Sequence, residues 1–262
     1  MSETIIAGVK PGLRVLVTAA AAGIGKVIAD TFLAHGAKVY VCDIDEKALE
    51  RTLAAEPRVL GMPVDVAEEA MVDRMFEDLV KRLGGLDVLV NNAGIAGPTA
   101  RVEDIAPADW RRTLAVNLSS HFYCTRRAVP LLKAVTDGAI INISSVAGRL
   151  GFVNRLPYAA TKWAIVGMTQ SLAKELGPHG IRVNAILPGV VAGPRIERVF
   201  AAEAKLSGTT VEAERKASLS KVSLRRMVSA QDVANMALFL ASPAGRNISG
   251  QALSVCGNVE TL

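Results

Sequence analysis

The sequence predicts an α/β fold: a single doubly wound domain whose seven-stranded, mostly parallel sheet carries helices on both faces. Short β-branched apolar runs alternate with segments of helical periodicity along the 262 residues. No repeat, low-complexity tract or Pro/Ser-rich linker divides the chain, so we expect residues 1–262 to form one domain. Turn-forming or polar residues follow six of the strand-like runs, at 18–25, 43, 65, 91–94, 144–145 and 188–189. Since such sheets bind ligands beyond the carboxyl ends of their strands, this clustering predicts a site there.

Each element follows from a local pattern. The first strand is expected at 13–18, because β-branched apolar residues there end in a run of small residues. The first helix is expected at 27–35, where Ile28, Thr31 and Phe32 share one face and Gly36 ends the periodicity. Further strands are predicted at 37–43, 59–64, 86–90, 139–143, 181–186 and 252–255, and further helices at 46–53, 68–83, 110–125, 158–176 and 231–241. Strands joined through helices imply right-handed crossovers and parallel pairing.

Composition excludes several classes of protein. The longest stretches without a charged residue are 13 residues, whereas a membrane-spanning helix needs about 18 or more apolar residues, so no membrane partner is expected. Residues 1–4 carry no basic segment typical of an export signal. Three cysteines without a CxxC pair and three histidines without ligand spacing predict neither a disulfide framework nor a metal site. A reduced, cytoplasmic protein fits these observations best.

The basic charge is local. The net charge is 30 − 25 = +5, and residues 195–226 alone supply +4, with eight Lys or Arg against four Asp or Glu. Aromatic residues make up only 4% of the chain, which leaves little surface for stacking on bases. The pattern therefore favours a small anionic ligand over a nucleic acid as the partner.

The first strand–helix connection is typical of a phosphate site. Its small residues, from Thr18 to Gly25, let the backbone approach a pyrophosphate at the helix N-terminus. Asp43 ends the second strand, where a carboxylate accepts hydrogen bonds from ribose hydroxyls and repels a 2′-phosphate. No arginine follows Asp43 directly, so NAD is favoured over NADP. Asp65 is a candidate for the adenine amino group, or alternatively a helix cap.

The helix expected at 158–176 carries the candidate chemistry. Tyr158 and Lys162 are four residues apart and therefore share one helix face. Tyr123 and Arg127 have the same spacing, but only Tyr158 has a serine, Ser145, placed after a buried-looking strand so that the two can meet. A phenol titrates near 10 in water, so its use as a base needs a neighbouring cation such as a fixed ammonium. We expect Ser145 to hold the substrate oxygen while Tyr158 takes its proton.

Together these motifs resemble the classical short-chain dehydrogenases/reductases over about residues 12–258. The resemblance rests on Thr18, Gly23-Ile24-Gly25, Asp65, Asn91-Asn92-Ala93-Gly94, Asn117, Ser145, Tyr158-x-x-x-Lys162 and Pro188-Gly189. It implies a Rossmann-type fold and, usually, a homotetramer or homodimer. It also implies that Tyr158 is the general acid/base, that Ser145 orients the substrate, and that Lys162 lowers the tyrosine pKa and binds the nicotinamide ribose. Asn117 would hold a water in a relay to Lys162, unless it is a solvent-exposed mid-helix residue.

The resemblance also implies a cofactor-binding set. Asn92, Ala93 and Gly94 would line the adenosine, and Pro188 and Gly189 would border the nicotinamide. The expected contacts to the cofactor are Thr18, Gly23, Ile24, Gly25, Asp43, Asp65, Val66, Asn92, Ala93, Gly94, Tyr158, Lys162, Pro188, Gly189 and Val191.

Two positions depart from the family pattern. Ala19 stands where a glycine is usual, so a position that often needs positive φ carries a Cβ. Gly193 stands where a threonine is frequent, so a hydroxyl contact to the cofactor is missing or replaced.

The segment at about 190–227 interrupts the alternation of strands and helices and is expected to form a lid over the substrate. Arg195 lies near its start, and Arg149 and Arg155 lie between Ser145 and Tyr158. Converging arginines would suit an anionic group; the alternative is exposed, solubilising arginines on mobile loops. Because Phe200 is the only aromatic residue of the lid, a polar, hydroxylated substrate, with an anionic group left open, is favoured over a steroid.

The sequence thus predicts an NAD-dependent oxidoreductase that interconverts a polar, hydroxylated secondary alcohol and its ketone. The alternatives are an NADPH-dependent 3-oxoacyl thioester reductase and a non-catalytic dinucleotide-binding scaffold or sensor. Ala160, Ala164, Gly167 and Ser171 form a face of small residues, which permits close packing either within the chain or against a second subunit.

Overall fold

The computed structural model describes residues 9–259; the expectation about an export signal concerns residues 1–4 and lies outside this range. A seven-stranded sheet has the order β3-β2-β1-β4-β5-β6-β7. Every strand pair is parallel, which sharpens the prediction of a mostly parallel sheet. The strands are β1 Arg14–Thr18, β2 Lys38–Asp43, β3 Leu60–Pro63, β4 Val88–Asn91, β5 Gly138–Ile143, β6 Ile181–Pro188 and β7 Ala252–Val255.

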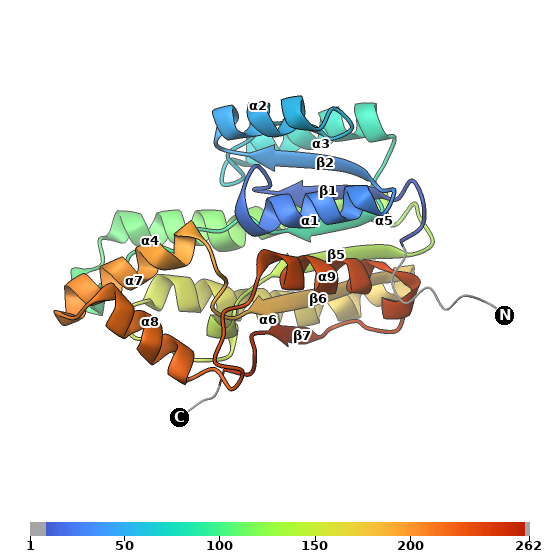
Figure 1. Ribbon diagram of the computed structural model, residues 1–262. Coiled ribbons are helices and arrows are strands. Elements are labelled where there is room, and N and C mark those ends of the chain that lie inside the picture. The colour runs from blue at the N-terminus through green and yellow to red at the C-terminus, as the bar shows by residue number, and fades with distance from the viewer. Residues whose placement is uncertain (1–8, 260–262) are drawn as a thin grey trace.

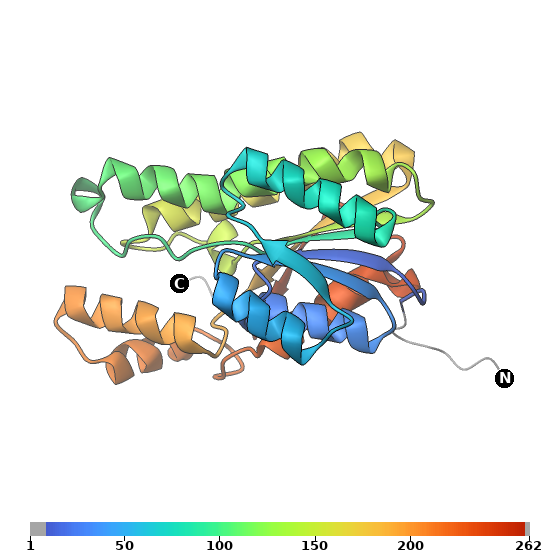
Figure 2. The same cartoon turned by 90° about the horizontal axis from the view of Figure 1, so that it is seen from above.

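Helices cover both faces of this sheet, so the predicted doubly wound fold is confirmed. The helices are α1 Gly23–Ala34, α2 Glu46–Ala55, α3 Glu69–Leu83, α4 Pro107–Leu114, α5 Ser120–Leu132, α6 Leu156–Leu176, α7 Pro194–Ser207, α8 Val211–Ser220 and α9 Ala230–Ala241, with short 3-10 turns η1 Val102–Asp104, η3 Val146–Gly148, η4 Gly177–His179 and η5 Pro243–Gly245 and a π-helical turn η2 Ala115–Ser119. Figure 2 shows α1, α2 and α9 on one side of the sheet and α3, α5 and α6 on the other.

The buried strands explain this arrangement. Alternate side chains of β1 point to opposite faces: Val15 and Val17 pack toward α1 and α9, whereas Leu16 packs toward α3 and α5. Both faces are therefore apolar, as a parallel sheet covered by crossover helices requires. Residues of both clusters are almost completely buried, and the sheet forms the rigid base from which the loops at its carboxyl edge extend.

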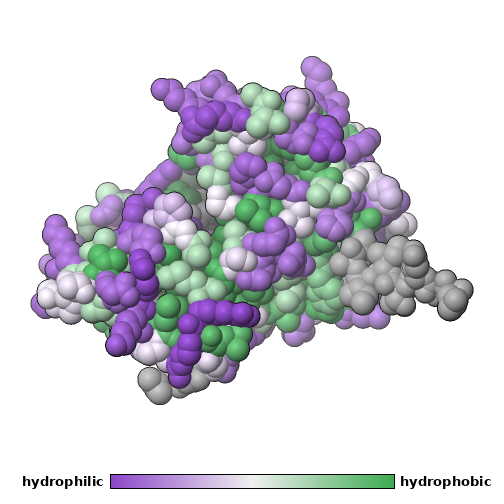
Figure 3. Space-filling model, viewed as in Figure 1, coloured by the Kyte–Doolittle hydropathy of each residue, from purple (hydrophilic) through white to green (hydrophobic). Residues whose placement is uncertain are grey.

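The carboxyl ends of the strands all point toward α4, α7 and α8 (Figure 1). These three helices extend beyond the sheet, so the loops that follow β1, β4, β5 and β6 lie between them and the sheet edge. In the space-filling view, the outline is indented between the part that carries α4, α7 and α8 and the part that carries α2 (Figure 3). The predicted site residues follow strands at this edge.

Three elements differ from the sequence prediction. The helix expected at 27–35 begins at Gly23, so the glycine-rich motif is its first turn rather than a loop. The helix expected at 110–125 extends from 107 to 132 and contains the π-helical turn η2. Residues 194–220 of the expected lid form the helices α7 and α8. The sequence did not predict them, because their many charged residues obscure the apolar periodicity of a helix. Across the described residues, the helices are too short or too polar to cross a membrane.

Candidate active site

Tyr158 and Lys162 lie on the first two turns of α6, as predicted. The helix starts after Arg155, and Pro157 fits there because a first-turn residue has no intrahelical partner for its N–H. The Lys162 ammonium is buried and donates to the carbonyl of Ile143 at the end of β5 (2.9 Å). It lies 5.6 Å from the centroid of the Tyr158 ring. The expected pair of phenol and ammonium is therefore brought together at the sheet edge.

Ser145 follows β5 and begins the short turn η3, where its Oγ accepts from the Ala147 N–H (3.2 Å). The neighbouring Ser144 donates to the carbonyl of Lys162 (2.8 Å). A Cβ at Gly148 would come within 2.7 Å of that same carbonyl, so this glycine permits the close approach of η3 to α6. The turn η3, which Ser145 begins, is thereby packed against the part of α6 that carries Lys162.

Asn117 lies within the π-helical turn η2 and is fully buried, so the alternative of a solvent-exposed residue is wrong. Its Oδ1 accepts from the Ile95 N–H (2.7 Å), and its Nδ2 donates to the Ile95 carbonyl (3.0 Å) and to the Thr161 hydroxyl (3.2 Å). The Asn117 side chain thus joins its own turn η2 to two other segments, the loop that follows β4 and the helix α6. A π turn is frequent at functional sites, and here it gives Asn117 its position.

The buried site perturbs two titrating groups. Burial and, as a second cause, the positive charge of Arg195 together lower the pKa of Lys162 to about 7. Burial, with the charge of Lys162 as a second cause, lowers the pKa of His121 to about 3, so this imidazole is neutral near pH 7. His121 lies one turn after Asn117 on the helix and faces the Ala93 carbonyl (3.3 Å).

The loops after β1 and β4 are joined by side-chain hydrogen bonds. The buried Thr18 hydroxyl accepts from the N–H groups of Asn92 and Ala93 (3.0 Å each). Asn92 in turn donates to the carbonyls of Thr18 (2.9 Å) and Ala19 (3.0 Å). The hydrogen bonds of Thr18 and Asn92 therefore fix the conformation of the predicted cofactor loop. Gly94, the last residue of this motif, lies close to Asn117 and Lys162, since a Cβ there would be 3.4 Å and 3.5 Å from Oδ1 and Nζ.

The turn between β1 and α1 fits a phosphate group. Ala19 has φ +52°, so the position does adopt the left-handed conformation for which glycine is usual, and the two Asn92 hydrogen bonds hold it there. A Cβ at Gly25 would collide with the Ala19 carbonyl and the Asn92 amide, so this packing requires glycine. Among the described residues no side chain caps α1, and its first turn holds no carboxylate. Its N–H groups at Gly23, Ile24 and Gly25 are thus suited to an anion.

Asp43 ends β2 beside this turn. Its two carboxylate oxygens accept from the N–H groups of Ala21 and Asp45 (3.0 Å each), so its side chain is fixed against the phosphate turn. Each oxygen retains a lone pair for a ribose hydroxyl. Asp65 pairs with Arg112 (2.9 Å) and accepts from the Ala67 N–H (3.0 Å). Since the N-cap of α3 is Glu68, Asp65 does not cap that helix. Val66 is buried in the core beside it.

The loop after β6 closes the other side of the predicted cofactor site. Pro188 ends β6, and Gly189 lies so close to Cys256 that a Cβ there would come within 2.8 Å of it. Val191 pairs with Val228, which connects the two ends of the expected lid. Gly193 has φ +145°, a conformation that L side chains rarely adopt, so the backbone here disfavours the threonine that is frequent in the family.

The three predicted arginines have different surroundings. Arg155 is only 5% exposed, which overturns the alternative of a solubilising residue, and its Cζ lies 4.9 Å from the Tyr158 ring centroid. Arg195 is exposed and reaches from α7 to the Gly94 carbonyl (3.0 Å), 5.9 Å from the same centroid. Arg149 instead bonds the Ala252 carbonyl and the Ser254 hydroxyl of β7. The structure therefore brings Arg155 and Arg195 together at Tyr158 and leaves Arg149 apart.

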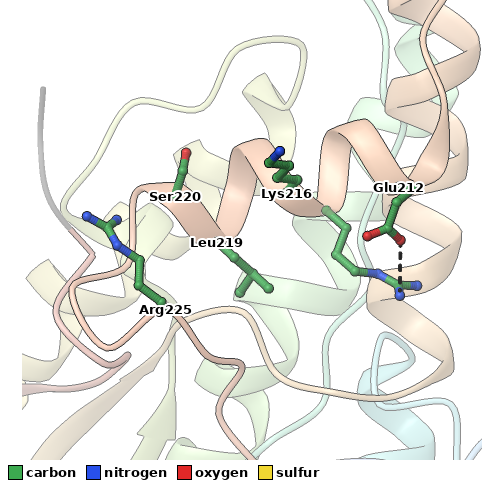
Figure 4. A pocket seen from close by; sticks show the side chains of 6 residues that line it. Glu212, Lys216, Leu219, Ser220 and Arg225 are labelled. Carbon is green, nitrogen blue, oxygen red and sulfur yellow. Dashed lines mark ion pairs between the residues drawn. The ribbon is translucent and has the colours of Figure 1, made fainter.

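A separate surface hollow lies on α8. It is lined by Glu212, Arg215, Lys216, Leu219, Ser220 and Arg225 (Figure 4) and contains none of the predicted site residues. Glu212 and Arg215, one turn apart, form an ion pair across its end (3.5 Å). In residues 9–259, His, Cys, Asp and Glu side chains form no group of three or more that could hold a metal ion.

Sequence reasoning missed several residues that support the site. Ser144 and Thr161 bond α6 and Asn117 through their hydroxyls, and His121 packs behind the loop after β4. The spacing of Asn117 and His121, one helical turn, was an available signal for His121. No local signal shows that Glu203 of α7 faces Arg155, because that contact joins distant segments.

Comparisons with known proteins agree with this geometry. Residues 18–258 match the family described as Enoyl-(Acyl carrier protein) reductase. The chain is 36% identical over 252 residues to trans-4-hydroxycyclohexanecarboxylate dehydrogenase of Sinomonas cyclohexanicum, covering 92% of this chain and 90% of that protein. It is 35% identical over 249 residues to 3-oxoacyl-(acyl-carrier-protein) reductase of Thermotoga maritima, covering 93% and 96%.

A solved structure is similar over nearly the same range. A single-residue variant of actinorhodin polyketide ketoreductase, solved with NADPH, superposes with a TM-score of 0.89 at 32% identity, covering 94% of this chain and 96% of that one. The seven-stranded sheet, the family match and these relatives agree. The chain therefore belongs to the short-chain dehydrogenase/reductase family of oxidoreductases, whose members act on CH–OH or keto groups and bind nicotinamide dinucleotides.

Proposed function

We propose that the protein is an NAD-dependent oxidoreductase that interconverts a polar secondary alcohol and its ketone, with Tyr158 as general acid/base. The observation that carries the proposal is the buried Lys162 ammonium, which is fixed by the Ile143 carbonyl and lies 5.6 Å from the Tyr158 ring centroid. Ser145 and Asn117 belong to η3 and η2, which both pack against α6. A phenol beside a fixed cation is the group that this site offers for proton transfer.

In the oxidation direction, Ser145 holds the substrate oxygen by a hydrogen bond and Tyr158, as phenolate, takes the hydroxyl proton. The C–H bond of the carbinol carbon would break as the C=O bond forms, and NAD, when bound, would supply the acceptor for the hydride. Lys162 stabilises the phenolate, and the proton leaves through a water that Asn117, fixed by its hydrogen bonds to the Ile95 backbone, would hold next to Lys162. In the reverse direction Tyr158 returns the proton to the ketone oxygen.

The cofactor preference rests on Asp43. Its carboxylate lies beside the phosphate turn, where it accepts from the Ala21 N–H. A negative charge at this place favours ribose hydroxyls and repels the additional phosphate of NADP. The similar ketoreductase was solved with NADPH, so this preference separates the proposed activity from that of its structural relative.

The substrate side of the site favours a polar ligand, and two guanidinium groups near Tyr158 favour an anionic one. The only aromatic residue of the proposed lid, at 190–227, is Phe200, which is 1% exposed and therefore offers no apolar wall to a steroid. One relative is a dehydrogenase named for a hydroxylated carboxylate, a compound that combines a hydroxyl group with an anionic group. We extend that substrate class, a small hydroxy compound, to this chain.

Two alternatives remain. An NADPH-dependent 3-oxoacyl thioester reductase is supported by the Thermotoga maritima relative, and Asp43 argues against its cofactor. A dinucleotide-binding scaffold or sensor would keep the fold without turnover, and the joint presence of Ser145, Tyr158 and Lys162 argues against it.

Initial rates with NAD and NADP on matched polyols, hydroxy acids and 3-hydroxyacyl thioesters test the proposal through absorbance of the reduced cofactor. We expect turnover with NAD on the small polar alcohols and an NAD preference that falls at least about ten-fold in Asp43→Asn, since the repelling charge is removed. Glu46→Gln, on the helix after β2, is the matched control and should keep the preference. Faster NADPH-dependent reduction of 3-oxoacyl thioesters would favour the first alternative, and binding of NAD without turnover would favour the second.

We also propose a homodimer or homotetramer in the cytoplasm. On α6, Gly167 and Ser171 are exposed, a Cβ at Gly167 would meet nothing within 4 Å, and the neighbouring Trp163 is 51% exposed. The chain itself does not pack against this part of the small-residue face, which supports a second subunit there. The three cysteines are free thiols, which supports a reducing compartment. Light scattering on the purified chain would measure the assembly.

A further inference from the structure

Three cationic side chains surround the Tyr158 ring. The guanidinium carbons of Arg155 and Arg195 and the Lys162 ammonium lie 4.9, 5.9 and 5.6 Å from its centroid. They come from three elements: the loop before α6, the first turn of α7, and α6 itself. Among residues 9–259, the one carboxylate within 4.0 Å of any of them is Glu203, which lies 3.9 Å from Arg155. The site therefore concentrates positive charge with little compensation.

Arg155 is a buried guanidinium whose hydrogen-bond donors are only partly satisfied. Its side chain is 6% exposed, and its Nη2 donates to the Ala96 carbonyl (3.1 Å). Its Nε is buried and has no hydrogen-bond partner among the described residues, and Glu203 is too far from Nη1 for a hydrogen bond. A buried guanidinium is costly unless acceptors satisfy its donors, and its planar fork matches a carboxylate. The open donors of Arg155, beside the reacting phenol, point to an anionic ligand.

Arg195 supplies a second guanidinium from the lid. It donates to the Gly94 carbonyl (3.0 Å), next to Lys162, and thus connects α7 to the loop after β4. It is exposed, and no carboxylate of the described residues lies within ion-pair distance. A hydrogen bond to a carbonyl holds it in place without neutralising its charge, so Arg195 is able to exchange this partner for an anion.

We propose that the substrate is a small hydroxy acid, or the matching keto acid, whose carboxylate is bound by Arg155 while Arg195 closes over it from the lid. The proposal rests on the proposed function, because it takes Tyr158 as the group that meets the carbinol. It extends that function by assigning to Arg155 the recognition of a second group of the substrate, its carboxylate.

Other sources of negative charge fit less well. Arg155 packs on the ring of Tyr158, so its ligand must lie only a few bonds from the reacting carbon. The phosphates of a thioester carrier are separated from the reacting carbon by the whole pantetheine arm. The phosphates of the cofactor are expected at the N-terminus of α1, which starts at Gly23 on another strand–helix connection.

Binding of unreactive probes tests the proposal without turnover. The probes are cyclohexanecarboxylate and butyrate, their carboxamides, and inorganic phosphate, each titrated calorimetrically into the full chain with NAD present. We expect each carboxylate to bind at least about ten-fold more tightly than its carboxamide, as a charge-assisted bidentate contact implies. Equal binding within a pair, no binding of either carboxylate, or tighter binding of phosphate would each overturn the assignment.

Variants locate the contact. Arg155→Met should abolish the preference for carboxylate over carboxamide, and Arg155→Lys should retain part of it. Because Arg155 is buried, the thermal unfolding of each variant is measured first. Arg195→Gln, at an exposed position, should weaken carboxylate binding about three-fold or more, whereas Arg198→Gln on the same helix should leave it unchanged. A folded Arg155→Lys or Arg195→Gln protein with the full wild-type preference would contradict the proposal.

These titrations, together with turnover rates on neutral alcohols and hydroxy acids, separate this inference from the proposed function. Turnover of neutral alcohols at rates equal to those of hydroxy acids would overturn the carboxylate assignment and leave the oxidoreductase intact. Carboxylate binding that depends on Arg155, without oxidation of any alcohol, would overturn the proposed function and leave the anion site intact.

Discussion

The floor of the site and its lid are built differently. On the floor, formed by the carboxyl ends of β1, β4 and β5 and the start of α6, Asn117, Thr18 and Lys162 are buried, and each bonds a backbone group of another element. In the lid, α7 buries only Phe200 and Ala204, and none of the residues Val211–Ser220 of α8 is buried. The floor is thus held by a network of hydrogen bonds, whereas the lid is anchored by a few buried apolar side chains, among them Phe200, Ala204 and Val222.

This difference teaches which property each region controls. Groups that move protons must hold one geometry, and a network of buried hydrogen bonds provides that. A region that admits and releases substrate must open at low cost, which suits an exposed helical pair with little buried surface. Variants of the floor should therefore change the chemical step, and variants of the lid should change substrate capture.

The largest effect is expected for Tyr158→Phe, which removes the proton-transferring hydroxyl from the floor. We expect kcat to fall by about 10²- to 10⁴-fold, with a much smaller change in NAD affinity, since Tyr158 is only one of the expected cofactor contacts. Tyr123→Phe, on α5, is the matched control, because Tyr123 has a basic residue at the same spacing and lies outside the site. Equal turnover of wild type and Tyr158→Phe in steady-state assays would reject the proposed base.

Phe200→Ala tests the lid. The ring is almost completely buried, and its removal should cost about 3 kcal/mol of local stability, seen as faster proteolysis within 190–227. The KM for substrate should rise while NAD affinity stays constant, because the floor is untouched. Leu206→Ala on the same helix, where the side chain is 42% exposed, should have little effect. A fall in kcat alone would contradict the division between lid and floor.

Asn117→Ala tests how much the buried hydrogen bonds of the floor stabilise the protein. It leaves the Ile95 N–H and carbonyl without their partner, so the free energy of unfolding in urea should fall by about 2–3 kcal/mol. Thr161→Val removes one of the same hydrogen bonds and should cost about 1 kcal/mol. If both variants were as stable as the wild type, these hydrogen bonds would not stabilise the π-helical turn, and packing alone would maintain it.

A pH-dependent effect, smaller than that expected for Asn117→Ala, concerns the buried ammonium of Lys162. Since burial lowers the pKa of Lys162 to about 7, the folded chain binds fewer protons than the unfolded chain above pH 7. The contribution of this residue to stability therefore rises with pH and is lost as pH falls back to 7. Relative to Lys162→Met, the wild-type free energy of unfolding should increase by about 2 kcal/mol from pH 7 to pH 9. A constant difference between the two proteins would show that Lys162 titrates normally.

The sequence alone determined the sheet, its parallel pairing and the position of the Tyr158–Lys162 pair, because apolar periodicity and helical spacing are local properties. It also marked Ala19 as a position that requires positive φ. Tertiary structure decided the π-helical turn at Asn117, the two lid helices and the burial of Arg155. These depend on contacts between segments far apart in the chain, such as Asn117 with Ile95 and Arg155 with Glu203. Whether an arginine is solvated or enclosed depends on what packs over it, and local pattern carries no information about that.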